Sequence, residues 1–119
     1  MFTIFNICKY ILLLVHYNLN VCEKIPNPIT QRLRCQIGNI KITEAVWGRR
    51  STSICPCSGR ARCDNTACEE DVTSVVRGEC DDQPHCDIEN VGIGQFGDPC
   101  RHIKKYLQLG YLCIERKYF

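Results

Sequence analysis

The stretch Gly94–Cys113, GQFGDPCRHIKKYLQLGYLC, is the part of the chain around which the fold is predicted to be organised. It opens with a Gly-Asp-Pro turn followed directly by Cys100. Pro99 fixes φ and lacks an N–H, and Asp98 offers carboxylate oxygens to nearby donors. A disulfide at Cys100 would hold this acid in place, close in sequence to Lys105. A fixed acid and ammonium suit recognition of a polar ligand, although an Asp that only caps its own turn is the common alternative.

The cysteine content indicates a disulfide scaffold. The chain has 119 residues and 11 cysteines, a density typical of small secreted domains and of metal modules. Structural zinc sites take paired cysteines roughly two to four residues apart. Cys55, Cys57, Cys63 and Cys68 are instead spaced C-x-C, C-x5-C and C-x4-C. We therefore expect disulfides, and neither a metal site nor any other cofactor.

Charge and cysteine pairing also bear on function. The 15 basic and 13 acidic residues include no long run of one sign, which excludes the basic stripe of a nucleic-acid binder. A cysteine nucleophile would need a free, activated thiol near a histidine, and complete pairing of the cysteines in disulfides would leave no such thiol. Acidic clusters such as Glu69–Asp71 are usually solvated faces rather than catalytic carboxylate pairs. The chain is therefore not expected to be an enzyme.

Residues 1–20 are predicted to be a secretory signal peptide. They contain the apolar run Ile11–Val15, and no acidic residue precedes Glu23. The apolar run is short for a membrane span, so an uncleaved anchor is the lesser alternative. Cleavage would remove Cys8 and leave ten cysteines, an even number that can pair completely in many ways. We expect a secreted, extracellular protein with one domain over residues 21–119 and no membrane span after cleavage.

Periodicity predicts a mainly β (α+β) fold. Ile40–Trp47 alternates apolar and polar residues, as a half-buried strand does, and Lys105–Ile114 is predicted to be the last strand. Thr66–Arg77 places acids before valines spaced at i, i+3 and i+4, which favours one short helix. Ser51–Asn65 is predicted to be a long loop that bridges must hold. The sum is a small, disulfide-rich antiparallel fold with long ordered loops.

These motifs together resemble the galactose- and rhamnose-binding lectin domain family (SUEL-type). The resemblance covers about Cys22 to Ile114. It is carried by Cys35 with Gly38, Ala45-Val46-Trp47-Gly48-Arg49, Phe96-Gly97-Asp98-Pro99-Cys100, Lys105-Tyr106-Leu107 and Tyr111-Leu112-Cys113. It implies an antiparallel β-sandwich with one short helix. It also implies four bridges: Cys22 with Cys55, Cys35 with Cys113, Cys68 with Cys100, and Cys80 with Cys86. Cys57 and Cys63 fall outside that ladder and are predicted to form a fifth bridge.

The resemblance further implies a sugar site that works without metal. Its members use a carboxylate after the first cysteine, the turn Asp and a following Lys, which match Glu23, Asp98 and Lys105 here. Three other expected sugar-contacting positions are altered: Trp47 stands where a Tyr is usual, His102 where a Gly is usual, and Asn90 is an imperfect match for an Asn before the FGDPC motif. Trp47 lies at the end of a predicted strand, so packing in the core or at its rim is the alternative to a ligand-facing ring. An imidazole at position 102 is expected to fill part of the pocket.

The first functional prediction is a lectin that recognises galactoside- or rhamnoside-type sugars on cell-surface or secreted glycans. An alternative is a protein-interaction module of the same fold with lost or altered sugar binding, whose partner would be a glycoprotein or receptor ectodomain. A disulfide-rich toxin-like or inhibitor protein is the third reading. Neither nucleic acid nor membrane is an expected partner.

Overall fold

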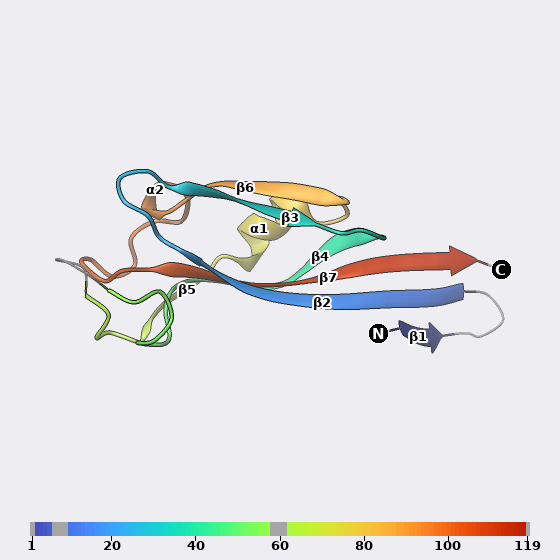
Figure 1. Ribbon diagram of the computed structural model, residues 1–119, viewed down its shortest axis with the longest axis horizontal. Helices are drawn as coiled ribbons and strands as arrows, with labels where there is room; N and C mark the ends of the chain where they lie inside the picture. Colours follow the sequence, from blue (N-terminus) through green and yellow to red (C-terminus); the bar gives the residue numbers. More distant parts are fainter. Residues whose placement is uncertain (1, 6–9, 58–61, 119) are drawn as a thin grey trace.

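The computed structural model describes residues 2–5, 10–57 and 62–118, and the side chains of 15–57 and 62–115. The strands are β1 (Phe2–Phe5), β2 (Tyr10–Cys22), β3 (Ile29–Arg34), β4 (Asn39–Arg49), β5 (Cys68–Asp71), β6 (His85–Val91) and β7 (Tyr106–Tyr118), and the helices are α1 (Thr73–Cys80) and α2 (Ile93–Phe96). A five-stranded sheet has the order β1–β2–β7–β4–β5, and β3 pairs with β6 in a second sheet. All these pairings are antiparallel, and the smaller sheet lies over the larger one in Figure 1. The predicted mainly β sandwich is confirmed.

The central strands β4 and β7 follow the predicted alternation. Leu107, Leu109, Tyr111 and Cys113 are buried on one face of β7, as expected for a strand with one face in the core. On β4, Ile40 and Ile42 are buried, and the register then shifts between Ile42 and Glu44. Beyond this irregularity all positions from Ala45 to Arg49 are buried, and Ala45 and Trp47 belong to the core cluster, so the bulge keeps apolar side chains on the core face.

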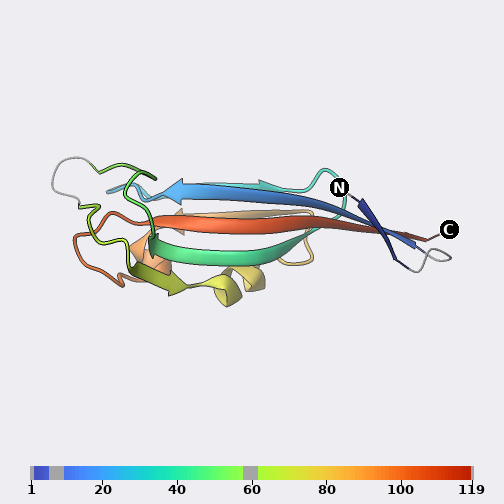
Figure 2. The same ribbon diagram turned by 90° about the horizontal axis from the view of Figure 1, so that it is seen from below.

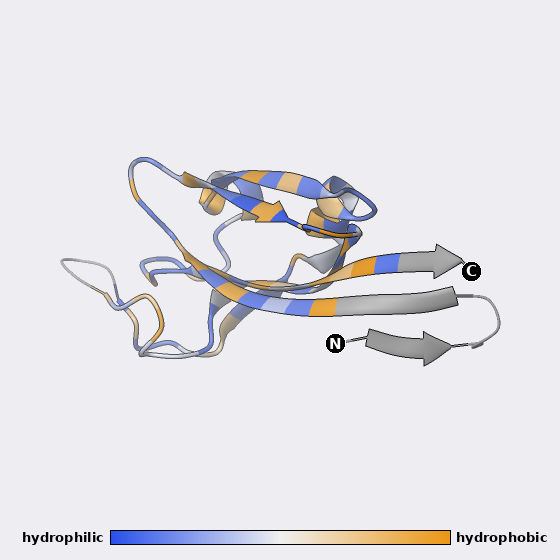
Figure 3. Ribbon diagram, turned by 45° about the vertical axis from the view of Figure 1, so that its right-hand side comes forward, coloured by the Kyte–Doolittle hydropathy of each residue, from blue (hydrophilic) through white to orange (hydrophobic). Residues whose placement is uncertain are grey.

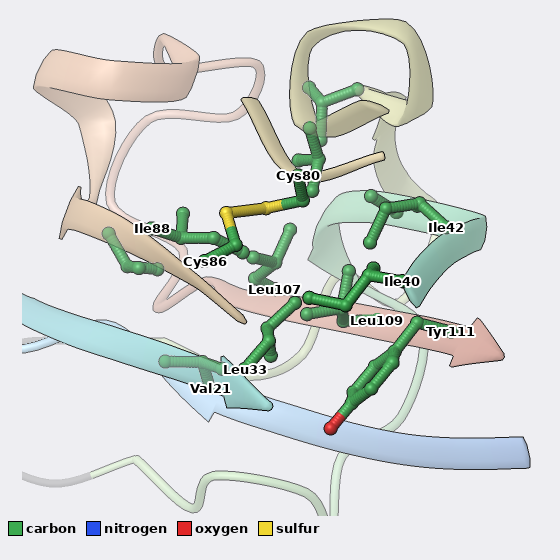
Figure 4. Close-up of a cluster of buried hydrophobic side chains, with 14 of the residues drawn as sticks. Val21, Leu33, Ile40, Ile42, Cys80, Cys86, Ile88, Leu107, Leu109 and Tyr111 are labelled. Carbon is green, nitrogen blue, oxygen red and sulfur yellow. A yellow bond between two sulfur atoms is a disulfide. The ribbon is translucent and has the colours of Figure 1, made fainter. Parts of the chain in front are cut away.

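The core fills the space between the two sheets. Val21 of β2, Leu33 of β3 and Ile88 of β6 are each at most 2% exposed and lie beside Leu107 in Figure 4. Figure 3 shows the matching alternation of hydrophobic and hydrophilic residues along the strands of the smaller sheet. The Cys80–Cys86 disulfide joins the end of α1 to β6 and is part of the same cluster. The two layers are therefore held by apolar burial and by a covalent link.

The predicted helix Thr66–Arg77 is only partly correct. Cys68–Asp71 forms strand β5, which pairs with Val46–Arg49 of β4, and α1 begins at Thr73 and runs to Cys80. Asp71 accepts a hydrogen bond from the Thr73 N–H at 2.9 Å. The acids therefore lie on an edge strand before the helix. Pairing with β4 satisfies backbone groups at these residues, and this long-range gain outweighs the local helical pattern.

Five disulfides join the ten cysteines that follow residue 20. The pairs are Cys22–Cys55, Cys35–Cys113, Cys57–Cys63, Cys68–Cys100 and Cys80–Cys86. Their Cα–Cα distances run from 5.2 to 6.0 Å, within the usual range for a bridge. The predicted ladder and the fifth bridge are thus present. Cys8 lies outside the described residues.

The predicted signal segment overlaps strand β2. β2 pairs with β7 from Tyr10 opposite Tyr118 to Cys22 opposite Tyr106. Within residues 1–20, the Tyr17 ring stacks on Tyr111 at 5.0 Å, and Leu19 packs against the core. Cleavage of a signal peptide within the first 20 residues stays a prediction. Among the described residues, no helix has the length and apolar character needed to cross a membrane.

Candidate functional site

The candidate site lies at the loop end of the sandwich, opposite the two chain termini (Figure 1). β2 ends at Cys22, directly opposite Tyr106, where β7 begins. On its other side Tyr106 is opposite Gly48 of β4. Glu23 and Lys105 therefore flank the same pair of strand ends, and Figure 2 shows the loops that extend past this edge. Antiparallel pairing alone brings these two distant positions together.

Lys105 is bonded to both of the other residues predicted to hold a sugar, Glu23 and Asp98. Its side chain is 3% exposed, and its Nζ lies 2.8 Å from Asp98 Oδ1. Its backbone N–H donates to Glu23 Oε1 at 3.0 Å, and its carbonyl accepts from the Glu23 N–H at 3.0 Å. Glu23, Asp98 and Lys105 thus form one bonded cluster, called the triad below. The structure brings together all three residues of the predicted set.

The triad leaves polar atoms for a ligand. Lys105 Nζ has three donor hydrogens, and it bonds Asp98 and the Ile103 carbonyl, the latter at 2.8 Å. Glu23 bonds through Oε1 and Asp98 through Oδ1, so within the described residues the second oxygen of each acid has no hydrogen-bonding partner. Asp98 is 36% exposed, whereas Glu23 is 6% exposed. The cluster is therefore a largely buried anchor, and Asp98 is the more exposed of its two carboxylates.

Two disulfides fix the acids of the triad. Cys22 precedes Glu23 and is bonded to Cys55, and Cys100 follows the Asp98-Pro99 turn and is bonded to Cys68. Each carboxylate is thus within two residues of a covalent link to another part of the chain. Because the backbone is held before a ligand arrives, less conformational entropy is lost on binding.

Arg49 is a component of the site that was not among the candidate residues selected from the sequence. It is fully buried in β4 and donates to four backbone carbonyls, those of Ser51, Ile54, Cys55 and Lys104, at 2.5 to 2.8 Å. Its guanidinium also lies 5.2 Å from the centre of the Tyr106 ring. One side chain thus ties the 51–55 loop to the residue before Lys105. The Gly-Arg that ends the Trp47 motif is the sequence signal for this role.

Trp47 does not have the surface position that a sugar-contacting residue needs. It is fully buried, its Nε1–H donates to the Gly97 carbonyl at 2.9 Å, and its ring lies 5.5 Å from that of Phe96. The alternation of β4 turns this ring into the core. Trp47 therefore supports the FGDPC turn from inside, and the expectation that it contacts a ligand is corrected to a positioning role.

His102 and Asn90 are exposed residues with unusual backbones. Their φ angles are +67° and +52°, in the left-handed region that glycine adopts at least cost. The His102 carbonyl accepts from the Arg62 N–H at 3.0 Å, which fixes the turn before Lys105. In the described part of the chain, no hydrogen bond or ion pair connects Asn90 with the triad. Direct contact of either side chain with a sugar stays a prediction.

Two surface hollows lie away from the triad. One is lined by Arg34, Cys35, Pro84 and His85. The other lies over β4, β5 and α1, and its lining includes Glu44, Arg50, Glu69 and Arg77. Charged side chains that line the second hollow are paired with one another, because Arg50 forms ion pairs with both Glu44 and Glu69. Within the described residues, no group of three or more His, Cys, Asp or Glu side chains is arranged to hold a metal ion.

Comparison with known proteins finds one matching family model and several similar lectins. Residues 33–113 match the model of the D-galactoside/L-rhamnose binding SUEL lectin domain. L-rhamnose-binding lectin ELEL-1 of Echinometra lucunter is 39% identical over 75 residues, 62% of this chain and 70% of that protein. L-rhamnose-binding lectin CSL1 of Oncorhynchus keta is 36% identical over 86 residues, 71% of this chain but only 29% of that protein.

A D-galactoside-specific lectin of Heliocidaris crassispina is 29% identical over 93 residues, 76% of this chain and 88% of that protein. The family match includes Asp98, Lys105 and the Trp47–Arg49 segment, and Glu23 lies before it. The matched residues contain the core strand β4, residues 106–113 of β7 and two members of the triad. The chain belongs to the D-galactoside/L-rhamnose binding SUEL lectin domain family.

Proposed function

We propose that the chain binds a galactoside- or rhamnoside-type sugar at the triad, without a metal ion. The observation that carries the proposal is the bonding of both acids to one buried lysine: Asp98 pairs with the Lys105 ammonium, and Glu23 accepts from the Lys105 backbone N–H. The names of the relatives support the sugar class, because they are rhamnose-binding and galactoside-specific lectins. The binding role implies no chemical step, and we infer that the chain is not an enzyme.

The chemistry of the triad suits neighbouring sugar hydroxyls. A hydroxyl both donates and accepts, so one hydroxyl can donate to the free oxygen of Asp98 and accept from Lys105 Nζ. The free oxygen of Glu23 can accept from the next hydroxyl along the ring. Hydrogen bonds to charged groups are stronger than those between neutral groups. The triad therefore favours a sugar ring whose two adjacent hydroxyls are spaced to match the carboxylate oxygens and the ammonium nitrogen.

We further propose that the protein acts outside the cell. The five disulfides support an oxidising compartment, and the apolar N-terminal segment supports secretion through a signal peptide within residues 1–20. The lectin domain then spans residues 21–119. Its partners would be glycans on cell surfaces or on secreted glycoproteins.

The test is calorimetric titration of the purified, disulfide-bonded protein with methyl galactoside and methyl rhamnoside. Asp98→Asn keeps the shape of the side chain but removes the charge, and we expect it to weaken binding by about 10- to 100-fold. Asp87→Asn is the matched control, because Asp87 is an exposed acid on β6 whose partner is Arg32. Far-UV circular dichroism of both variants checks that each has folded.

Equal affinities of Asp98→Asn and the parent protein would overturn the assignment of the site. A folded parent protein that binds neither sugar, and is blank on a broad glycan array, would favour the protein-interaction alternative. The exposed imidazole of His102 beside the segment that leads to Lys105 is the observation that favours this second reading.

A further inference from the structure

The backbone around Arg62 is paired with the segment that leads into Lys105. The Arg62 N–H donates to the His102 carbonyl at 3.0 Å, and the Lys104 N–H donates to the Arg62 carbonyl at 2.8 Å. Arg62 and Ile103 thereby form a parallel bridge. The adjacent Cys63 is bonded to Cys57. The position of Arg62 along the chain segment next to the triad is therefore set by backbone bonds and a disulfide, and does not depend on its side chain.

This pairing gathers positive charge beside the triad. We call Arg62, Arg101, His102 and Lys104 the cationic flank. Arg101 and His102 are exposed, Lys104 is half-buried, and the Arg62 side chain is 62% exposed. Segments 62–64 and 101–104 contain a single acid, Asp64, which bonds Nε and Nη2 of Arg62. Three permanent cations are thus matched by one carboxylate at this part of the surface.

Lys104 and Arg101 of the cationic flank differ from exposed cations that acids neutralise. Arg32 is paired with Asp87, Lys41 with Asp81, and Arg50 with two glutamates. Lys104 Nζ instead donates to a neutral group, the Pro56 carbonyl, at 3.0 Å. Arg101 has no ion pair within the described residues, whereas Arg62 of the flank is paired with Asp64. The flank therefore keeps uncompensated positive charge on the segment that leads into Lys105 of the triad.

We propose that the cationic flank makes the triad select sugars that carry an oxyanion, either a sulfate ester or a carboxylate, near the hydroxyls it binds. This inference rests on the proposed function of the triad. Guanidinium and ammonium groups form charge-assisted hydrogen bonds with such anions, and arginine can do so with two parallel donors. A neutral sugar gains nothing from the flank, so the effect is one of specificity between charged and uncharged sugars.

The experiment compares sugars that differ only in the anion. Methyl galactoside and methyl rhamnoside are titrated beside their monosulfate esters and beside methyl galacturonide, which separates the sulfate source from the carboxylate source. At about 10 mM salt we expect at least one anionic sugar to bind about fivefold or more tightly than its neutral parent. At about 150 mM salt, where the Debye length falls from roughly 30 to roughly 8 Å, this ratio is expected to shrink.

A double variant identifies the groups responsible. Arg62→Gln with Lys104→Gln removes two charges of the flank and keeps the backbone hydrogen bonds of both residues, and it is expected to bring the ratio close to one. The control Arg32→Gln with Lys41→Gln removes two charges on other surfaces and should keep the ratio of the parent. The proposal would be contradicted if the affinity ratio of anionic to neutral sugar stayed unchanged in the flank variant. It would also be contradicted if this ratio fell equally in the flank variant and in the control variant.

The remaining outcomes separate this inference from the proposed function. If neutral sugars bind and no anionic sugar binds more tightly, the inference fails while the triad keeps its role. If neutral and anionic sugars all fail to bind the folded protein, both fail. Binding of anionic sugars alone, lost in the flank variant, supports the inference and narrows the ligand class.

Discussion

Lys105 is the residue on which the electrostatics of the site depends. Burial of an ammonium costs several kcal/mol unless the charge is paired and its hydrogens are bonded. Asp98 supplies the opposite charge, and the Ile103 carbonyl takes a second hydrogen. The Glu23 carboxylate is bonded to the backbone of the same residue. The charged groups of the triad are therefore held in one arrangement by bonds within the chain.

Arg49 gives a prediction about the frame behind the triad. Arg49→Met leaves one buried and three partly buried carbonyls without this donor, and an unsatisfied buried group costs about 1–3 kcal/mol. With partial relaxation we expect a loss of about 3–5 kcal/mol in the free energy of unfolding, measured by urea titration with the disulfides intact. Arg49→Lys keeps the charge but cannot reproduce the planar fork of donors, and it should restore only part of the loss.

The matched control for Arg49 is Arg50→Met, since the neighbouring Arg50 side chain is exposed and bonds surface acids. We expect this control to change the unfolding free energy by less than about 1 kcal/mol. Equal losses in the Arg49→Met and Arg50→Met variants would show that the four carbonyl bonds do not hold the frame.

At single positions, the sequence predicted which charged side chains come together better than it predicted which side chains are exposed. Glu23, Asp98 and Lys105 were identified by motif, and they do lie together. For Trp47 the sequence left both a core and a ligand-facing position open, and the structure places the residue in the core. Which face its ring takes depends on a register shift in β4 that no local pattern signals. The role of Arg49 depends on carbonyls from distant segments, and such bonds are not encoded in the spacing of nearby residues.

Among the elements, the two-stranded sheet carries an exposed ion pair with a measurable pH dependence. Arg32 of β3 is directly opposite Asp87 of β6, and Nε lies 2.9 Å from Oδ1. The hydrogen bond from Arg32 is the main cause that lowers the pKa of Asp87 below its ordinary value, and the positive charges of Arg32, His85 and Arg34 act in the same direction. The ionised carboxylate is thus favoured in the folded state.

The sign of the pH effect follows from this shift. Because the pKa of Asp87 is lower in the folded than in the unfolded state, the contribution to stability is present above the unfolded value of about 3.9 and is lost as the pH falls through the folded pKa. NMR titration of the Asp87 carboxyl carbon measures this. Arg32→Gln is expected to raise the pKa of Asp87, and an unchanged midpoint would contradict the role of the guanidinium.

Strands with strong alternation could be predicted, and elements fixed by distant pairing could not. β4 and β7 were found because one face of each is buried between the sheets. β5 was taken as part of a helix, because its acids before valines match a helical start, while its partner residues on β4 lie 19 to 25 positions earlier in the sequence. The one-turn helix α2 follows directly after the glycine at position 92 and has no periodic signal of its own.

For the whole molecule, the position of the site relative to the termini matters most. The chain is elongated, with principal extents of 58 × 22 × 20 Å, and the triad lies at the end opposite the two termini (Figure 1). The Cys35–Cys113 bridge joins residues that are 78 apart in the sequence. It links the residue that follows β3 of the smaller sheet to β7. A ligand at the loop end would therefore meet a surface that is held by disulfides.

The most direct test of the central claim is amide chemical-shift mapping by NMR as the isotope-labelled protein is titrated with methyl galactoside and methyl rhamnoside. The triad predicts saturable shifts at the amides of Glu23, Asp98 and Lys105, with signals such as those of Lys41 and Asp87 unchanged. Shifts concentrated instead around Glu44, Arg50 and Arg77, or no shifts with either sugar, would contradict the claim that the sugar binds at the triad.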